Sequence, residues 1–220
     1  MLGVLIGSLV LNLLLLGGAA WALRRAGGRA VLGRLLPARF APRPDFAGQA
    51  RARFVPPSSG AVILLGDSQL ERAPLLDLLD LPVRNRAISG ARTSDLAEWL
   101  DGVLAEQPAQ LVLMIGSNDV WQGRPLAESA AALREVFARV AAGAGCPVIV
   151  VSVPPLLGRD GAVRRFNEML AGLAAEFGHR FVDIVTPLAG TQWTDDGLHL
   201  NLAAYREVTP LVREKVARGI

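Results

Sequence analysis

Beyond residue 60, short apolar segments alternate with longer segments whose apolar residues recur at helical spacing. The short segments hold five or six residues each, too few for a buried helix, and Gly or Pro residues bound them. Such segments are typical of β-strands. The predicted strands are Ala61–Leu65, Val83–Ile88, Leu111–Ile115, Val148–Val153 and Phe181–Val185.

The longer segments predict helices that lie between and after these strands. Regular alternation of strands and helices indicates a parallel sheet that helices cover on both faces. The predicted helices run from Thr93 or Ser94, either of which suits an N-cap, to Glu106, from Leu126 to Ala142, from Val163 to Phe177, and onward from Asn201.

The beginning of the chain differs from the rest. Residues 2–23 are almost wholly apolar, with Ser8 and Asn12 as the polar interruptions. About 20 such residues suffice to cross a bilayer as a helix, so this segment predicts a transmembrane anchor. A cleaved signal peptide is the alternative, because residues 20–22 read Ala-Trp-Ala, but no basic residue precedes Arg24. A buried helix of a soluble domain is the third and least favoured interpretation.

Arginine is concentrated directly after this apolar segment. Residues 24–54 hold eight arginines against one acid, Asp45, a net charge of +7, whereas the whole chain carries +3 and residues 55–220 therefore carry −4. A basic segment beside an apolar helix is typical of contact with anionic lipid headgroups. Nucleic-acid binding is disfavoured, because this segment lacks interleaved aromatic residues and the domain that follows is acidic.

These observations divide the chain into three parts. Residues 1–23 are a transmembrane anchor or a signal peptide, residues 24–58 a basic juxtamembrane segment and linker, and residues 59–220 a globular domain. The positive-inside rule places that domain in the cytoplasm, with a periplasmic or secreted location as the alternative. The single cysteine, Cys146, cannot form an internal disulfide, so cysteine content favours neither compartment.

Small and polar residues follow the predicted strands. Gly66-Asp67-Ser68 follows the first strand, Ser89-Gly90 the second, and residues 116–119, Gly-Ser-Asn-Asp, the third. After the fifth strand, Asp196 precedes His199 by three residues. Ligands of open parallel sheets bind outside the carboxyl ends of the strands, so we expect these groups to gather at one edge.

This edge could support nucleophilic acyl transfer. A serine hydroxyl needs a base to remove its proton, and the usual base is an imidazole that a carboxylate holds. The chain has two histidines. His179 lies between a helix end and a strand and is interpreted as a surface loop residue. His199 has a carboxylate, Asp196, close enough in sequence to orient its ring.

Three further residues admit both a structural and a functional interpretation. Ser68 is a good helix N-cap, but a hydroxyl at a helix N-terminus also lies in a positive field. Gly90 could be a turn glycine, or a position where a backbone N–H approaches a developing oxyanion. Asn118 could close a turn, or donate its side-chain amide to the same oxyanion.

Taken together, these clusters resemble the SGNH hydrolases, also called the GDSL family of esterases and lipases, near the bacterial lysophospholipase and thioesterase branch. The matching stretches are "GDSQ", "NRAISGART", "GSND" and "DGLH", in the order of the family. The resemblance implies that Ser68 is the nucleophile, His199 its base and Asp196 the acid that orients the base. It also implies an oxyanion hole made by the Ser68 amide, the Gly90 amide and the Asn118 side chain.

The resemblance and the alternation together predict a flavodoxin-like three-layer sandwich with a five-stranded parallel sheet, preceded by the transmembrane helix. The expected activity is hydrolysis of a small-molecule or lipid acyl ester without metal or cofactor. Gln69 departs from the family name, which has Leu there, and we expect this to alter packing beside the nucleophile.

Functions of different classes compete with this interpretation. An α/β-hydrolase would need G-x-S-x-G, and residues 66–70 read G-D-S-Q-L. A metallophosphoesterase could use Asp, Asn and His ligands, but two histidines are few for a site with two metal ions. An acyltransferase would use the same acyl-enzyme as an esterase, and a non-catalytic membrane-tethered binding module would use none of this chemistry.

Overall fold

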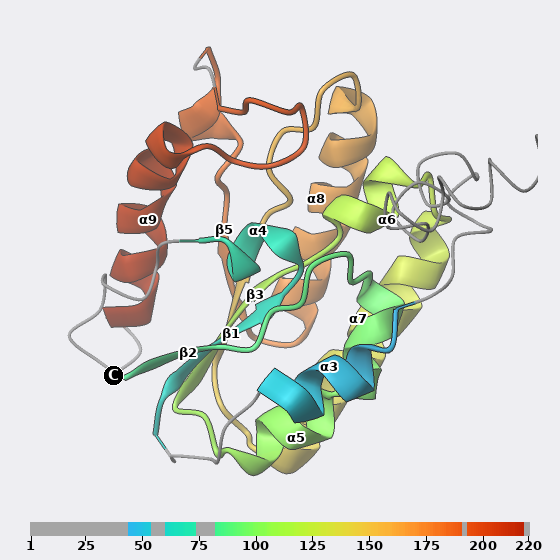
Figure 1. Cartoon of the computed structure of the whole chain (residues 1–220), viewed down its shortest axis with the longest axis vertical. Helices are drawn as coiled ribbons and strands as arrows, with labels where there is room; N and C mark the ends of the chain where they lie inside the picture. Colours follow the sequence, from blue (N-terminus) through green and yellow to red (C-terminus); the bar gives the residue numbers. More distant parts are fainter. Residues whose placement is uncertain (1–43, 54–59, 74–81, 191–192, 218–220) are drawn as a thin grey trace, which may run out of the picture. The chain divides into compact units, whose positions relative to one another are not determined.

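A computed structural model describes residues 44–53, 60–73, 82–190 and 193–217 (Figure 1). The chain divides into two units, residues 1–44 and 45–220, and the description below concerns the second. The predicted anchor and most of the basic segment lie outside the described residues. Within the described ranges, every helix is too short or too polar to span a bilayer.

Five parallel strands form one sheet at the centre of the second unit (Figure 1). The strands are β1 (Val62–Gly66), β2 (Val83–Asn85), β3 (Gln110–Met114), β4 (Val148–Val151) and β5 (Arg180–Val182). Their order is β2-β1-β3-β4-β5, which is the flavodoxin-like order. The predicted α/β fold with a five-stranded parallel sheet is therefore confirmed.

Helices cover both faces of this sheet. The helices on one face are α3 (Phe46–Arg53), α5 (Leu100–Ala105), α7 (Leu126–Gly143) and α8 (Asp160–Glu176), and α9 (Leu202–Ala217) lies on the other (Figure 1). Successive strand residues point to opposite faces: Ile63 and Leu65 pack in the first cluster, and Val62 and Leu64 pack in the second. Strands β1 and β4 lack polar side chains because both of their faces are buried, whereas the outer strands β2 and β5 are only partly buried and carry Arg84 and Arg180.

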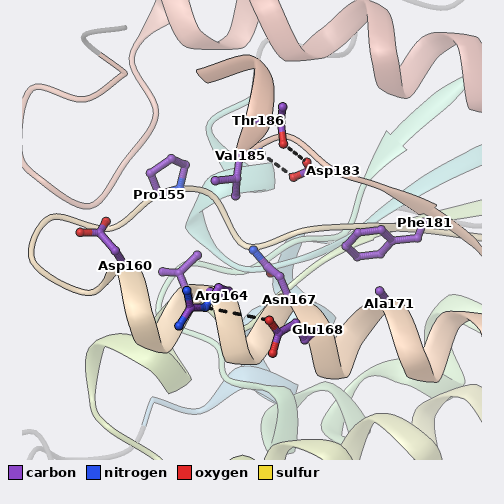
Figure 2. Close-up of a pocket in the computed structure, with 11 residues that line it drawn as sticks. Pro155, Asp160, Arg164, Asn167, Glu168, Ala171, Phe181, Asp183, Val185 and Thr186 are labelled. Carbon is purple, nitrogen blue, oxygen red and sulfur yellow. Dashed lines mark hydrogen bonds and ion pairs between the residues drawn. The ribbon is translucent and has the colours of Figure 1, made fainter. Parts of the chain in front are cut away.

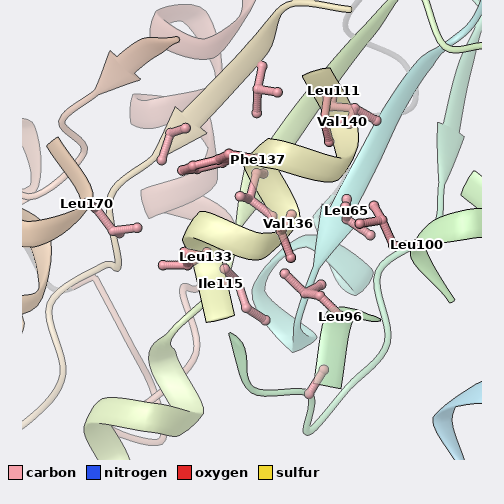
Figure 3. Close-up of a cluster of buried hydrophobic side chains, with 14 of the residues drawn as sticks. Leu65, Leu96, Leu100, Leu111, Ile115, Leu133, Val136, Phe137, Val140 and Leu170 are labelled. Atoms are coloured by element: carbon pink, nitrogen blue, oxygen red, sulfur yellow. The ribbon is translucent and has the colours of Figure 1, made fainter. Parts of the chain in front are cut away.

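The larger hydrophobic cluster lies between the sheet and α7. Figure 3 shows Val136 and Phe137 of α7 beside Leu65, Leu111 and Ile115 from the sheet side. All five side chains are at most 2% exposed. This packing holds α7 against the sheet beside β1 and β3. The candidate site lies at the carboxyl ends of these two strands.

Four strands, β2, β3, β4 and β5, end one to three residues earlier than the sequence predicts. Beyond two of these ends, a side chain accepts a backbone hydrogen bond. Strand β2 ends at Asn85, whose side-chain oxygen accepts a hydrogen bond from the Ala87 amide. Strand β5 ends at Val182, and two residues later the Ile184 amide donates to the Ser152 hydroxyl. The predicted extents to Ile88 and Val185 were therefore too long.

The helix predicted over residues 93–106 is divided at Trp99. A 3₁₀ helix, η3, spans Thr93–Glu98, and α5 follows it. The N-cap of η3 is Arg92, not Thr93 or Ser94 as predicted. Thr93 instead donates its hydroxyl and its amide to Asp119.

Residues 46–53 form helix α3, where the sequence pattern predicts a linker. Phe46 is fully buried, and its ring centroid lies 5.8 Å from that of Trp99. Ala50 is buried in the same cluster. The packing of Phe46 and Ala50 in the core stabilises this short polar helix. Local composition does not reveal such a tertiary contact.

A buried ion pair provides a stability prediction. The Arg86 guanidinium donates to both carboxylate oxygens of Glu106, at 2.6 and 2.9 Å, and both side chains are under 10% exposed. We expect Glu106→Gln to lower the free energy of unfolding by about 3 kcal/mol, because it removes the charge that faces a buried guanidinium. Urea denaturation measures this change.

The exposed pair Arg134–Glu176 provides the control for this measurement, since both of its side chains are about half exposed. Glu176→Gln should change the free energy of unfolding little, because solvent screens exposed pairs. Equal losses in the two variants would contradict the prediction.

Candidate active site

Ser68 begins the short helix α4 (Ser68–Glu71), directly after β1. A Cβ atom on Gly66 would lie 1.9 Å from the Met114 carbonyl oxygen, so glycine lets β1 end close against β3. Asp67 caps α4 by accepting a hydrogen bond from the Gln69 amide at 2.9 Å. The Ser68 side chain is therefore held at the carboxyl edge of the sheet, at a helix N-terminus.

Ser68, His199 and Asp196 form one hydrogen-bonded chain. The Ser68 hydroxyl oxygen lies 3.0 Å from Nε2 of His199, and Nδ1 of His199 lies 2.6 Å from Oδ2 of Asp196. Oδ1 of Asp196 accepts hydrogen bonds from the His199 amide at 2.7 Å and the Leu198 amide at 3.0 Å. The structure thus brings together three residues that the sequence singled out.

The Asp196 carboxylate sets the tautomer of the imidazole. Its slight burial acts to raise the pKa of Asp196, but the hydrogen bonds from the His199 amide, the His199 ring and the Leu198 amide outweigh this and hold the pKa well below its ordinary value. Asp196 is therefore ionised at neutral pH and accepts a hydrogen bond from the Nδ1–H group of His199. Nε2 is then the acceptor for the Ser68 hydroxyl proton.

Gly90 lies in the loop that follows β2, and Asn118 lies in the short helix that follows β3. Gly90 has φ of +83°, a conformation that favours glycine, and a Cβ atom there would meet nothing within 4 Å. One amide hydrogen of Asn118, on helix α6 (Ser117–Trp121), bonds the carbonyl oxygen of Ala91 at 2.8 Å. This bond joins the loop after β2 to α6 and orients the second amide hydrogen of Asn118.

Two carboxylates to which the sequence analysis gave no role hold these segments in place. Asp119 accepts hydrogen bonds from the amide and hydroxyl of Thr93 and from the hydroxyl of Ser129, so it joins α6, η3 and α7. Glu71 accepts from the amide and the hydroxyl of Ser89, which precedes Gly90. Both contacts join residues distant in sequence, and no local motif signals them.

His199 and His179 occupy different environments. His179 is half-buried, and its ring centroid lies 4.8 Å from that of Phe137 in an edge-to-face contact. Burial lowers the pKa of His179, which favours the neutral ring. His179 does lie in the loop between α8 and β5, as predicted, but its ring packs on Phe137 and does not point freely into solvent, because an imidazole can pack as an aromatic side chain.

A cavity of about 440 Å³ lies between α8 and the chain that follows β5 (Figure 2). Val163, Phe181 and Val185 form much of its apolar lining, and Asp160 and Glu168 lie at its polar margin. None of the residues in the hydrogen-bonded chain lines this cavity. Among the described residues, no cluster of three or more His, Cys, Asp or Glu side chains has the arrangement of a metal site.

Asp67 leads to a prediction about pH and stability. Burial raises the pKa of Asp67 to about 7, from about 4 in an unfolded chain. Between these values the folded protein keeps a proton that the unfolded chain has released, so the free energy of unfolding falls as pH rises through this window. Asp67→Asn can still cap α4 but does not titrate, so it should lack this part of the decline.

Denaturation of both proteins at about pH 4.5 and about pH 7.5 measures this difference, since the two values bracket most of the window. Burial also raises the pKa of Asp119, and the charge of Asp119 contributes to the raised pKa of Asp67. Because Asp119 is present in both proteins, the comparison measures the titration of Asp67 together with this coupling. The same pH dependence in both proteins would show that Asp67 titrates as an ordinary carboxyl group.

Comparison with known proteins places this chain in a family. A model of the GDSL-like lipase/acylhydrolase family matches residues 65–207. A GDSL-like lipase from Bacteroides thetaiotaomicron is similar in structure, with a TM-score of 0.68, 18% identity, and coverage of 80% of this chain and 100% of that chain.

Two further crystal structures are also similar. The structure of TesA has a TM-score of 0.64 and 23% identity, and the match covers 73% of this chain and 99% of that chain. Axe2, an acetylxylan esterase from Geobacillus stearothermophilus, has a TM-score of 0.59 and 20% identity, with coverage of 74% and 94%. No curated protein matches the sequence. At these identities the solved structures show the fold, and the family model shows the family.

Proposed function

Since the chain belongs to the GDSL-like lipase/acylhydrolase family, we propose that it hydrolyses an acyl ester through a covalent acyl-enzyme on Ser68. The observation that carries the proposal is the pair of distances at His199, 3.0 Å from its Nε2 to the Ser68 hydroxyl and 2.6 Å from its Nδ1 to Asp196. Such a chain supplies a nucleophile, a base and a group that orients the base.

The reaction then has two stages. His199 takes the proton of Ser68 as the hydroxyl attacks the ester carbonyl, and it returns this proton to the departing alcohol or thiol. Water next attacks the acyl-enzyme while His199 takes its proton, and His199 then returns this proton to the Ser68 oxygen as the bond to the acyl group breaks and the acid leaves. In each stage the developing oxyanion accepts hydrogen bonds from the backbone amides of Ser68 and Gly90 and from the side chain of Asn118.

We place the substrate at a membrane. Residues 2–23 are long and apolar enough for an anchor, and the eight arginines of residues 24–54 would attract anionic headgroups. By the positive-inside rule, the domain of residues 59–220 would face the cytoplasm. A lysophospholipid or another acyl ester that partitions into the membrane fits this location. Resistance to extraction by high salt, with release by detergent, tests the anchoring.

Labelling with a fluorophosphonate tests the chemistry directly. We expect the purified full-length protein in detergent to form an adduct, which peptide mapping locates at Ser68, and the His199→Ala protein to form almost none. A folded protein that does not react would favour a non-catalytic binding module. Faster acyl transfer to an added alcohol than to water would instead identify a transferase, which uses the same acyl-enzyme.

A further inference from the structure

Gln69 follows Ser68 directly, and its side chain contacts the backbone on both sides of His199. Its Nε2 donates to the carbonyl oxygen of Leu198 at 2.7 Å, and the Leu200 amide donates to its Oε1 at 3.2 Å. One side-chain amide therefore holds the residues before and after the histidine. Gln69 is fully buried, so water does not compete for these bonds.

Gln69 is itself held in place at its backbone. Its amide donates to Asp67, and its carbonyl oxygen accepts a hydrogen bond from the Tyr205 hydroxyl of α9 at 2.5 Å. Tyr205 is 5% exposed and packs in the second hydrophobic cluster. The bonds to Leu198 and Leu200, on either side of His199, thus start from a rigid point on the same short helix that carries Ser68.

The hydrogen bonds of Asp196 do not perform this task. Asp196 lies three residues before His199, and it bonds the His199 ring and the amides of Leu198 and His199. These bonds are internal to one loop and move with it, so they orient the ring without fixing its distance from Ser68. Leu157 also bonds this loop, at Gly197, but it belongs to the loop after β4 and not to the nucleophile helix.

We propose that Gln69 is a positioning residue that sets the distance between the Ser68 hydroxyl and Nε2 of His199. This inference rests on the proposed function, because the distance matters only if His199 takes the proton of Ser68. A leucine at this position would fill space, but it would leave the Leu198 carbonyl and the Leu200 amide without their partner. The glutamine therefore has a role beyond packing.

The test replaces Gln69 with methionine, which has a similar length but cannot form either hydrogen bond. We expect kcat for an ester to fall about tenfold, with KM nearly unchanged, since the reacting groups lose their alignment. The rate of fluorophosphonate labelling at Ser68 should fall in parallel. A change in KM alone, or an unchanged kcat with an unchanged rate of labelling, would overturn the inference.

Gln110→Met is the matched control. Gln110 is also fully buried, and its Nε2 donates to the carbonyl oxygen of Val216 at 3.1 Å, but it lies at the first residue of β3, at the opposite end of that strand from the site. This variant loses a buried amide bond of the same kind, so it should lose stability while keeping kcat. Equal losses of kcat in the two variants would show that Gln69 acts only through stability.

Amide hydrogen exchange separates this inference from the proposed function. The Leu200 amide should exchange faster in Gln69→Met than in the wild-type protein or in Gln110→Met, whether or not the protein turns over a substrate. Unchanged exchange at Leu200 would overturn the contact itself. If the wild-type Ser68 does not react with fluorophosphonate, the proposed function fails and the catalytic consequence of Gln69 fails with it, while the exchange result still decides the contact.

Discussion

Replacing Ser68 with alanine should reduce ester hydrolysis by at least about 10⁴-fold, and replacing His199 with alanine should have a comparable effect. Ser68→Ala removes the atom that forms the acyl-enzyme. His199→Ala removes the acceptor that lies 3.0 Å from the same hydroxyl. Because the two residues act in one step, the double variant should be little worse than either single variant. Steady-state rates measure all three.

Ser94→Ala and His179→Ala are the matched controls for these variants. Ser94 is exposed on η3 and is not part of the hydrogen-bonded Ser68, His199 and Asp196. His179 is the other histidine of the protein. Ser94→Ala should keep full turnover, and His179→Ala should lose thermal stability, because its ring packs on Phe137, but not kcat. Near-normal turnover in Ser68→Ala or His199→Ala would refute the proposed mechanism.

The sequence predicts the sheet well because its signals are local. Strands buried on both faces are continuous apolar segments, so their existence and their positions along the chain could be predicted from composition and spacing. The flavodoxin-like arrangement of the sheet was predicted with the help of the family resemblance. The ends of the strands could not be predicted, since the side chains of Asn85 and Ser152 accept backbone hydrogen bonds just beyond β2 and β5, and composition does not signal these bonds. The break at Trp99 is also tertiary, because its indole N–H donates to the Arg86 carbonyl oxygen at 3.1 Å.

The candidate site likewise combines features that the sequence reveals with features that only the structure reveals. Asp196 and His199 are three residues apart, so their pairing is visible in the sequence, and Ser68 is visible as the end of a strand. The contacts of Gln69 with Leu198 and Leu200 join residues about 130 positions apart, so no local pattern indicates them. Sequence reasoning thus finds groups that could react, and the structure adds the groups that hold them.

Replacing Asn118 with alanine should reduce kcat by roughly a hundredfold or more, with a small change in KM. Asn118 is the second residue of α6 and uses one amide hydrogen on the Ala91 carbonyl oxygen, 2.8 Å away, which leaves the other to stabilise the oxyanion. The oxyanion forms only as the hydroxyl attacks, so the loss should fall on the transition state and not on substrate binding.

Two comparisons separate this role from a structural one. Asn167→Ala removes an asparagine that also bridges backbone, with 2.8 and 2.9 Å bonds to Val153, but it lies on α8, outside the candidate oxyanion site, and should keep kcat. Asn118→Asp keeps the shape of the side chain but places a negative charge where the oxyanion develops, so it should be at least as damaging as Asn118→Ala. The Asn118→Asp and Asn118→Ala proteins both lose the donor to the Ala91 carbonyl oxygen, so they differ in the added charge. If Asn118→Asp retained more turnover than Asn118→Ala, the side chain at position 118 would not face the oxyanion.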